Sequence, residues 1–316
     1  MDRRKFFSRL GGVTVASSVA CAVTAKAAEE RAEQAPVAET ALPTISLGPH
    51  RLSRLIVGSN PLLGYSYMGP HSDRLMREYF TVERSVEFLL ACERAGITAH
   101  QFSYSPKRPV TAEILRKVRE RGSRMKFFCL ASRREDIRGA IAETQPIAVV
   151  HHGGVTDRCF AEGRSSVVRD FVKAVHDQGL LAGVSAHNPD CIRRIADEGW
   201  QVDFFMTCFY FLTRKFFHKP GERYQEPELL YIAYPFYRRD PEIMTSVVRQ
   251  VDQPCLGFKI LAAGRKCRTQ GTVRDAFRFA FANIKPTDGV IVGMFPRFFD
   301  EIAANVRYTR QFGRPA

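Results

Sequence analysis

The chain lacks the short motifs by which several classes of protein are commonly recognised. It contains no CxxC pair, no glycine-rich loop of the Rossmann or Walker type, and no repeat in which aromatic and basic residues alternate. Nothing in it therefore resembles a nucleic-acid-binding module, and we expect no nucleic-acid partner. The missing glycine motifs leave nucleotide binding undecided, because not every nucleotide site is built on them.

A long apolar run is also absent. The N-terminal stretch GGVTVASSVACAV is short and rich in Gly and Ser, so it is a poor membrane span. It follows the pair Arg3 and Arg4 and precedes Ala25-Lys26-Ala27, a cleavage site with small residues at its first and last positions, and this order resembles a twin-arginine export signal. We therefore predict a signal peptide over residues 1–27, recognised by the twin-arginine export machinery, and a periplasmic or cell-envelope location. A lipoprotein modified at Cys21 is the alternative.

Residues 28–44 are rich in Ala, Glu and Pro without any hydrophobic period, which predicts a flexible linker before a single folded domain over residues 45–316. The net charge of the chain is +14, and removing residues 1–27, with five basic side chains and one acidic, leaves +10. Such an excess favours anionic ligands or an envelope surface. The plainer alternative is that solvated helix faces carry these charges.

Eight cysteines would suggest disulfides in an exported protein, but their positions argue otherwise. Cys129, Cys208 and Cys255 lie in or beside apolar runs, where a cysteine behaves as a small buried hydrophobic residue. Seven cysteines remain if Cys21 leaves with the signal, and an odd number cannot pair completely. We expect the thiols to stay reduced inside a protein that crosses the membrane already folded.

Eight short apolar runs recur along the chain, and amphipathic stretches with apolar positions three and four apart separate them. Continuous apolar character is typical of parallel strands buried on both faces. This alternation predicts an α/β fold, specifically a (β/α)₈ TIM barrel in one domain. The runs are Arg54–Asn60, Ile97–Tyr104, Met125–Ser132, Pro146–Gly153, Leu180–Asn188, Val202–Tyr210, Cys255–Gly264 and Gly289–Met294.

In such a barrel the active site lies at the C-terminal ends of the strands and in the loops that follow them. Two of these loops, 61–80 and 211–240, are long enough to cover a ligand, or else pack against a helix or a partner. The polar residues at the strand ends are the candidates for chemistry: Asn60, Gln101, Tyr104, Ser132, Arg133, His151, His152, Ser185, His187, Asn188, Cys208, Tyr210, Lys259, Arg265 and Arg297.

Carboxylates are missing from these strand ends, and the nearest, such as Asp157, stand several residues into the loops. Hard cations need oxygen ligands and glycoside hydrolysis needs a carboxylate pair, so we expect neither. His151, His152 and His187 could bind a metal together with Cys208, but adjacent side chains in a strand point to opposite faces. We therefore predict no metal site.

Lys259 is the most informative single residue, because it interrupts the apolar run GFKILAAG. A buried lysine needs a partner for its charge. It either meets an anion at the strand end or is desolvated and acts as a nucleophile or base, unless it extends outward between helices. The small residues Ala262–Gly264 would let a phosphate approach the backbone, at a position where many barrels hold phosphate.

Several segments resemble the aldo/keto reductases, in the same order along the barrel: AGITAHQFSY, PIAVVHHGGVTD, GLLAGVSAHN, GFKILAAGR and GVIVGMFPRFFDEIAANV. The resemblance implies NADP as the cofactor and a catalytic Asp, Tyr, Lys and His. The Asp falls on Gln101 and the Lys on Ser132, while the Tyr falls on Pro106, two residues after Tyr104. The His falls on His151, so the catalytic set is largely replaced.

The resemblance also implies cofactor-binding positions. One matches the contact to the nicotinamide amide, and others match contacts to phosphate or adenine. They are Ser185, Asn188, Lys259, Arg265, Arg297 and Asn305.

From these observations we predict an exported oxidoreductase that acts on a carbonyl or sugar-like small molecule with a nicotinamide cofactor. The predicted catalytic residues are Gln101, Tyr104, His151 and Lys259, with His151 polarising the substrate oxygen and Tyr104 as the substitute proton donor. One alternative is a sugar lyase or isomerase that uses Lys259, His151 and His187. A second alternative is a barrel that binds a partner without catalysis.

Overall fold

The computed structural model describes residues 41–217 and 234–314. The predicted signal peptide over residues 1–27, Cys21 and most of the predicted linker over residues 28–44 lie outside the described residues. Folded structure begins slightly before the expected boundary, because Leu42 is already buried and Thr44 opens the first strand.

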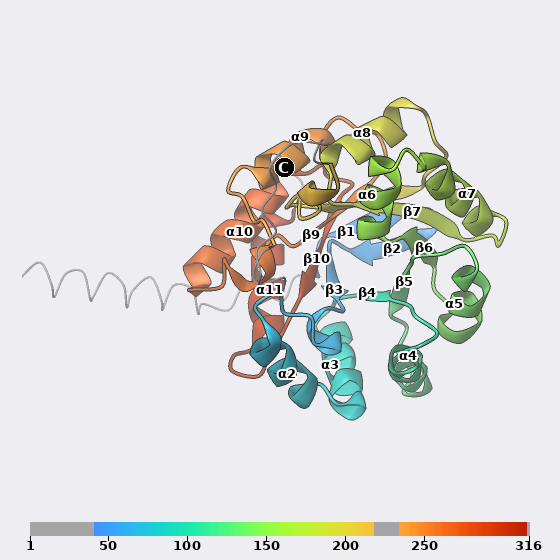
Figure 1. Ribbon diagram of the computed structural model, residues 1–316. Coiled ribbons are helices and arrows are strands. Elements are labelled where there is room, and N and C mark those ends of the chain that lie inside the picture. Colours follow the sequence, from blue (N-terminus) through green and yellow to red (C-terminus); the bar gives the residue numbers. More distant parts are fainter. Residues whose placement is uncertain (1–40, 218–233, 315–316) are drawn as a thin grey trace, which may run out of the picture. The chain divides into compact units, whose positions relative to one another are not determined.

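The centre of the fold is a closed barrel of eight parallel strands in the order β10-β3-β4-β5-β6-β7-β8-β9, with helices around it (Figure 1). Each strand falls within one of the eight apolar runs, so the predicted (β/α)₈ fold is confirmed. The strands are β3 (Leu55–Gly58), β4 (Ala99–Ser103), β5 (Lys126–Ala131), β6 (Ala148–His151), β7 (Leu181–Ala186), β8 (Phe204–Cys208), β9 (Cys255–Phe258) and β10 (Gly289–Gly293).

Both faces of the strands are buried, which explains why the runs are apolar throughout. Alternate residues such as Ile56, Phe128 and Phe204 fill the barrel interior, and the residues between them pack against the helices. A two-stranded hairpin, β1 (Thr44–Leu47) and β2 (His50–Ser53), adds Ile45, Leu47 and Leu52 to the interior cluster. The interior is therefore a packed core, and ligands must bind at its ends.

Helices follow every strand of the barrel, and two strands are followed by a pair. They are α2 (Pro70–Tyr79), α3 (Val82–Arg94), α4 (Val110–Glu120), α5 (Asp136–Thr144), α6 (Gly153–Ala161), α7 (Ser165–His176), α8 (Pro189–Asp197), α9 (Asp240–Val248), α10 (Gln270–Asn283) and α11 (Glu301–Phe312). The expectation of a continuous loop over residues 61–80 was wrong, because α2 begins at Pro70, a residue that favours the first turn of a helix.

The seven cysteines of the described residues are free thiols, and Cys267 is the exposed one among them. Burial raises the pKa of Cys208 and Cys255 to about 12, so these two thiols stay protonated at neutral pH. In the described part of the chain, no helix has the length and apolar character needed to cross a bilayer.

Candidate functional site

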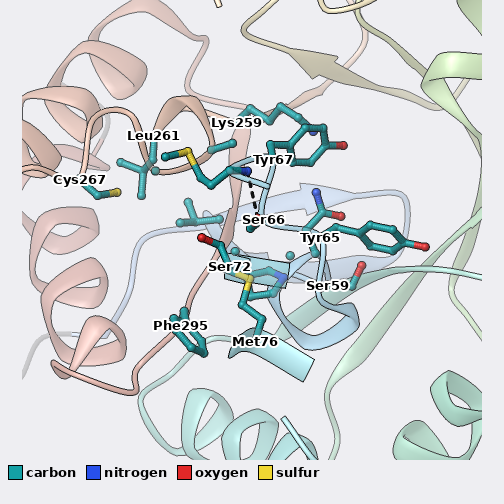
Figure 2. A pocket seen from close by; sticks show the side chains of 18 of the residues that line it. Ser59, Tyr65, Ser66, Tyr67, Ser72, Met76, Lys259, Leu261, Cys267 and Phe295 are labelled. Carbon is teal, nitrogen blue, oxygen red and sulfur yellow. Dashed lines mark hydrogen bonds between the residues drawn. The ribbon is translucent and has the colours of Figure 1, made fainter. Parts of the chain in front are cut away.

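A cavity of about 380 Å³ opens at the C-terminal ends of β3, β9 and β10, and we call it the mouth pocket. The loop between β3 and α2 forms one wall, with Ser59 and Tyr67, and the loop after β9, with Lys259 and Cys267, forms another (Figure 2). Gln101 lines the pocket from the end of β4. This is the end of the barrel where the sequence predicted chemistry.

The wall between β3 and α2 is held by Asp73, which is buried in the first turn of α2. Its Oδ1 accepts hydrogen bonds from the backbone N–H of Ser66 at 2.7 Å and from the hydroxyl of Ser66 at 2.5 Å. Apolar side chains stand exposed at the rim of the pocket, with Met68 at 49% and Phe298 at 76%. The pocket is thus a firm cleft with an apolar edge, a common design for sites that bind organic ligands.

Lys259 follows β9 directly and is the cation of the mouth pocket. Its Nζ lies 4.4 Å from the centre of the Tyr67 ring and 5.0 Å from that of Phe258. No carboxylate of the described residues lies within ion-pair distance of it. Burial is the largest single influence on the pKa of Lys259 and lowers it, but Tyr67, Cys208 and Tyr234 together raise it, so the pKa lies above the usual value. A protonated Lys259 would therefore meet an anion in the mouth pocket without a competing carboxylate among the described residues.

The backbone beyond Lys259 also suits an anion. The amide N–H groups of Ile260 and Leu261 donate no hydrogen bond to another described residue. Lys259, Ala262 and Ala263 take left-handed conformations with φ of 60°, 51° and 49°, which cost a non-glycine residue energy and recur at ligand-binding turns. Successive N–H groups in such turns form concave sites for phosphate.

Two of the predicted catalytic residues meet in the mouth pocket. Gln101 is 8% exposed and lies on its wall, as does Lys259. Ser185, predicted to hold a nicotinamide amide, has a buried hydroxyl without a hydrogen-bond partner among the described residues. It does not line the mouth pocket, and its role stays a prediction.

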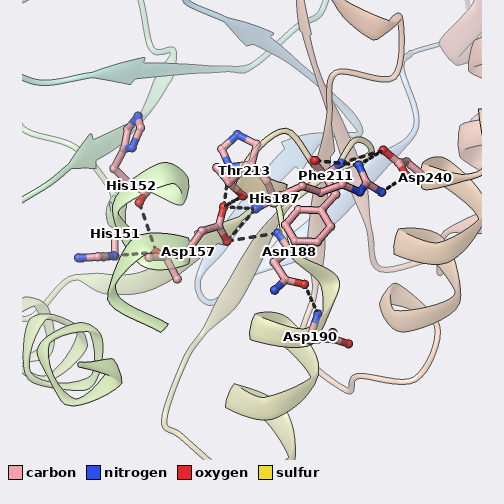
Figure 3. Close-up of polar contacts among 11 residues, drawn as sticks. His151, His152, Asp157, His187, Asn188, Asp190, Phe211, Thr213 and Asp240 are labelled. Atoms are coloured by element: carbon pink, nitrogen blue, oxygen red, sulfur yellow. Dashed lines mark hydrogen bonds and ion pairs between the residues drawn. The ribbon is translucent and has the colours of Figure 1, made fainter. Parts of the chain in front are cut away.

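His151 does not reach the mouth. It belongs to the face of β6 that packs against helices, because Ala148 and Val150 occupy the interior face and side chains alternate along a strand. Its Nδ1 lies 2.7 Å from the hydroxyl of Thr156, and its ring is 4.8 Å from that of Phe171 in α7. Burial lowers its pKa to about 3. The catalytic role assigned to His151 therefore needs correction. The side chain of its neighbour His152 points in a different direction (Figure 3).

Tyr104 does not reach the mouth pocket either. Its hydroxyl donates a hydrogen bond to Oε1 of Glu143 in α5 at 2.8 Å and lies above Gly139 of the same helix. Burial, together with Glu143, raises the pKa of Tyr104 to about 12. A phenol held on an outer helix with a raised pKa is a poor proton donor for the barrel mouth, so the substitution proposed for the missing Tyr does not fit the structure.

Five predicted cofactor residues, Ser185 among them, lie away from the mouth pocket lining. Asn188 caps α8, its Oδ1 accepting the N–H of Asp190 at 3.0 Å. Arg265 stacks 4.0 Å from the Phe236 ring and donates to the carbonyl of Tyr67 at 3.2 Å, so it supports the pocket wall. Arg297 is exposed beside Phe298, and Asn305 is buried in α11.

A polar cluster lies across the mouth, at the ends of β6 and β7; the sequence had singled out its two histidines as candidates but not their association with Asp157 and Thr213. It consists of His152, Asp157, His187 and Thr213 (Figure 3). Asp157 had been set aside because it stands well past the strand end. The structure shows that Asp157 lies in α6, where its carboxylate reaches the backbone N–H of His187 just beyond β7. Within the described residues, no group of three His, Cys, Asp or Glu side chains could hold a metal ion.

No protein-family model matches the chain, and no curated protein matches it at the sequence level. Among solved structures it is similar to the aldo-keto reductase AKR11C1 from Bacillus halodurans, with 12% identity and a TM-score of 0.52 over 84% of this chain and 90% of that one.

Two further solved structures are more distant. One is the glycerol dehydrogenase AKR11B4 from Gluconobacter oxydans, at 14% identity and a TM-score of 0.44; the match covers 73% of this chain and 66% of that one. The other is a truncated 3-deoxy-D-arabino-heptulosonate 7-phosphate synthase from Thermotoga maritima, at 13% identity and a TM-score of 0.48, covering 86% and 91%. At such identities a likeness shows the fold alone. The chain folds as an eight-stranded parallel barrel of the kind that AKR11C1 also has.

Proposed function

We propose that the chain is an oxidoreductase that binds a nicotinamide dinucleotide, of the NADP type, in the mouth pocket and acts on a carbonyl or sugar-like substrate. The observation that carries this proposal is Lys259, a cation without a carboxylate partner among the described residues, at the wall of a cleft beside free backbone N–H groups. The likeness in fold to an aldo-keto reductase supports the same reading.

The residues present fit such a cofactor. Lys259 and the N–H groups of Ile260 and Leu261 would hold its phosphates, since charge-assisted and backbone donors are the usual phosphate ligands. The buried hydroxyl of Ser185, without a partner among the described residues, would take the carboxamide. When bound, the cofactor would exchange a hydride with the substrate carbon. The protein itself would bind, orient and exclude water.

The charge of Lys259 also bears on the alternative reading as a sugar lyase or isomerase. An imine-forming or basic lysine has to be neutral, and enzymes achieve this by lowering the pKa of the amine. The pKa of Lys259 is raised instead. This residue therefore suits anion binding better than nucleophilic attack.

Replacing Lys259 with methionine is expected to weaken NADPH binding about 10- to 100-fold, since a hydrogen bond to a charged group contributes roughly 1.5–3 kcal/mol. The fluorescence of NADPH titrated with protein measures the Kd. Lys173→Met is the matched control, because Lys173 lies on α7 and pairs with Asp177 at the surface. Equal affinities of the two variants, or no binding to the unmodified chain, would overturn the assignment. Mass spectrometry of natively purified protein would reveal a retained cofactor.

We also propose that residues 1–27 direct the folded chain through the twin-arginine machinery to the periplasm or cell envelope. The paired Arg3 and Arg4 carry this proposal. The double variant Arg3→Lys, Arg4→Lys keeps the charge but is expected to remain in the cytoplasm, which cell fractionation and immunoblotting would show. The control Lys5→Arg should be exported like the unmodified chain. Export of the double variant at an unchanged level would contradict the proposal.

A further inference from the structure

The carboxylate of Asp157 is enclosed by hydrogen-bond donors. Its Oδ2 accepts from the Thr213 hydroxyl at 2.8 Å and from Nδ1 of His187 at 2.9 Å. The backbone N–H groups of His187 and Asn188 add bonds of 3.0 and 3.2 Å (Figure 3). The side chain of Asp157 is 0% exposed. A buried carboxylate with this many donors is held in a single orientation, and it fixes the groups around it in turn.

The contact with Asp157 determines which nitrogen of His187 is free. Carboxylate oxygens accept hydrogen bonds, so Nδ1 of His187 must carry a hydrogen. Its Nε2 has no hydrogen-bond partner among the described residues, and the side chain is 11% exposed. The centre of the imidazole lies 5.7 Å from the centre of the Phe258 ring. Phe258 lines the mouth pocket, and its ring also contacts the Nζ of Lys259. His187 thus lies directly behind Phe258 of the pocket lining, and its outer nitrogen has no partner among the described residues.

Two neighbouring polar groups face the same region. Nδ1 of His152 and the hydroxyl of Ser185 are buried and have no partner among the described residues. A side chain added at Gly153 would lie 2.9 Å from the Ser185 hydroxyl and 3.2 Å from Cε1 of His187, so these groups meet on one face of this glycine. Burial, with the nearby His187 and Lys259, lowers the pKa of His152 to about 4, so it is neutral at physiological pH.

We propose that His187, oriented by Asp157, is the acid–base residue that exchanges a proton with the substrate oxygen, and that Asp157 and Thr213 are positioning residues. The proposal rests on the proposed oxidoreductase function. The substrate is then a carbonyl compound or the corresponding alcohol. His152 and Ser185 offer it further hydrogen bonds from the same side of the mouth.

The proton balance follows from the tautomer. In reduction, the imidazolium of His187 would give the proton on Nε2 to the substrate oxygen, and a bound reduced nicotinamide would supply the hydride to the carbonyl carbon. The C=O bond becomes CH–OH, and a neutral imidazole protonated on Nδ1 remains. In oxidation, the free Nε2 takes the hydroxyl proton as the hydride leaves. Asp157 keeps its proton count throughout and serves to orient the ring.

Nuclear magnetic resonance of ¹⁵N-histidine-labelled protein at pH 8 tests the orientation. We expect the neutral ring of His187 in the unmodified chain to carry its hydrogen on Nδ1. Asp157→Asn should shift it toward the form protonated on Nε2, because an amide N–H can face Nδ1 and require it to accept. Asp190→Asn is the matched control, since Asp190 is an exposed partner of Arg193 at the start of α8. A ring protonated on Nε2 in the unmodified chain would overturn the proposal.

Carbethoxylation by diethyl pyrocarbonate, mapped by mass spectrometry, tests the access of Nε2. His187 should react at least tenfold faster than His100 and His151, which are 2% and 1% exposed. A His187 as slow as these two would also overturn the proposal. The variant His187→Gln should bind NADPH within threefold of the unmodified chain. If neither protein binds NADPH, the proposed oxidoreductase function fails, whereas the tautomer and labelling results do not depend on the cofactor.

Discussion

Replacing Arg54 with methionine is expected to lower the free energy of unfolding by about 3–5 kcal/mol, because it leaves two buried carbonyls and one partly buried carbonyl without their charged donor. Arg54 precedes β3 and is 2% exposed. Its guanidinium donates to the carbonyls of Asp288 and Gly313 at 2.7 Å and of Lys285 at 2.8 Å. These bonds connect the first strand of the barrel to segments more than 230 residues away in sequence.

The aromatic environment does not replace those bonds. The guanidinium of Arg54 lies 5.0 Å from the centre of the Phe281 ring, so methionine would keep part of the packing while losing every donor. Burial lowers the pKa of Arg54, but an arginine stays charged at neutral pH. Urea unfolding followed by circular dichroism would measure the loss.

Arg51→Met is the matched control for this experiment, because Arg51 is exposed and its single side-chain bond is to Thr44 at 2.9 Å. The control should change the free energy of unfolding by less than about 0.5 kcal/mol. If the Arg54 variant unfolds within 1 kcal/mol of the unmodified chain on this scale, the described hydrogen bonds do not carry the stability assigned to them.

Acid is expected to destabilise the barrel steeply between pH 6.5 and about pH 4. Burial lowers the pKa of His100 and His152 to about 4 and that of His151 to about 3. An unfolded chain would bind protons at these rings near pH 6.5. The folded chain therefore holds fewer protons in this window. The stability that depends on neutral rings is fully present above pH 6.5. It is lost as the pH falls toward the pKa values that these histidines have in the folded chain.

With three such rings, the free energy of unfolding should change by up to about 4 kcal/mol per pH unit near pH 5. Each proton taken up on unfolding contributes roughly 1.4 kcal/mol per pH unit to this slope. Urea unfolding at several pH values would measure the slope. His100→Gln should remove about a third of this slope, because it removes one of the three histidines. The ring of His100 is buried against Phe102 and Phe127, and its Nδ1 lies 3.0 Å from the Val57 carbonyl oxygen. His71→Gln, at an exposed position on α2, is the control. A flat profile above pH 4.5 would contradict the prediction.

The strand alternation within β6 shows why the resemblance assigned a role to a histidine that does not reach the barrel mouth. The sequence places two histidines at the end of this strand and requires that they face opposite ways. Which one enters the barrel depends on the phase of β6 relative to its neighbours, where Val150 faces inward. A resemblance based on residue order carries no information about that phase, so it assigned the role to His151.

Tyr104 illustrates a different limit. A tyrosine just beyond a strand end is a reasonable donor candidate, but its hydroxyl is bound by Glu143, a residue 39 positions away on α5. The Asp157 cluster was missed for the same reason. Its members His187 and Thr213 lie 30 and 56 positions from Asp157. Contacts between such distant segments form only when the barrel closes, so local sequence patterns do not predict them.

The amino-acid sequence by itself determined the barrel, because a run of residues that is apolar on both faces can be buried only between a core and a layer of helices. It also singled out Lys259, since a charge within an apolar run is costly unless something meets it. The tertiary structure decided which polar side chains share the mouth. That choice depends on strand phase and on hydrogen bonds between distant segments, which exist only in the folded chain.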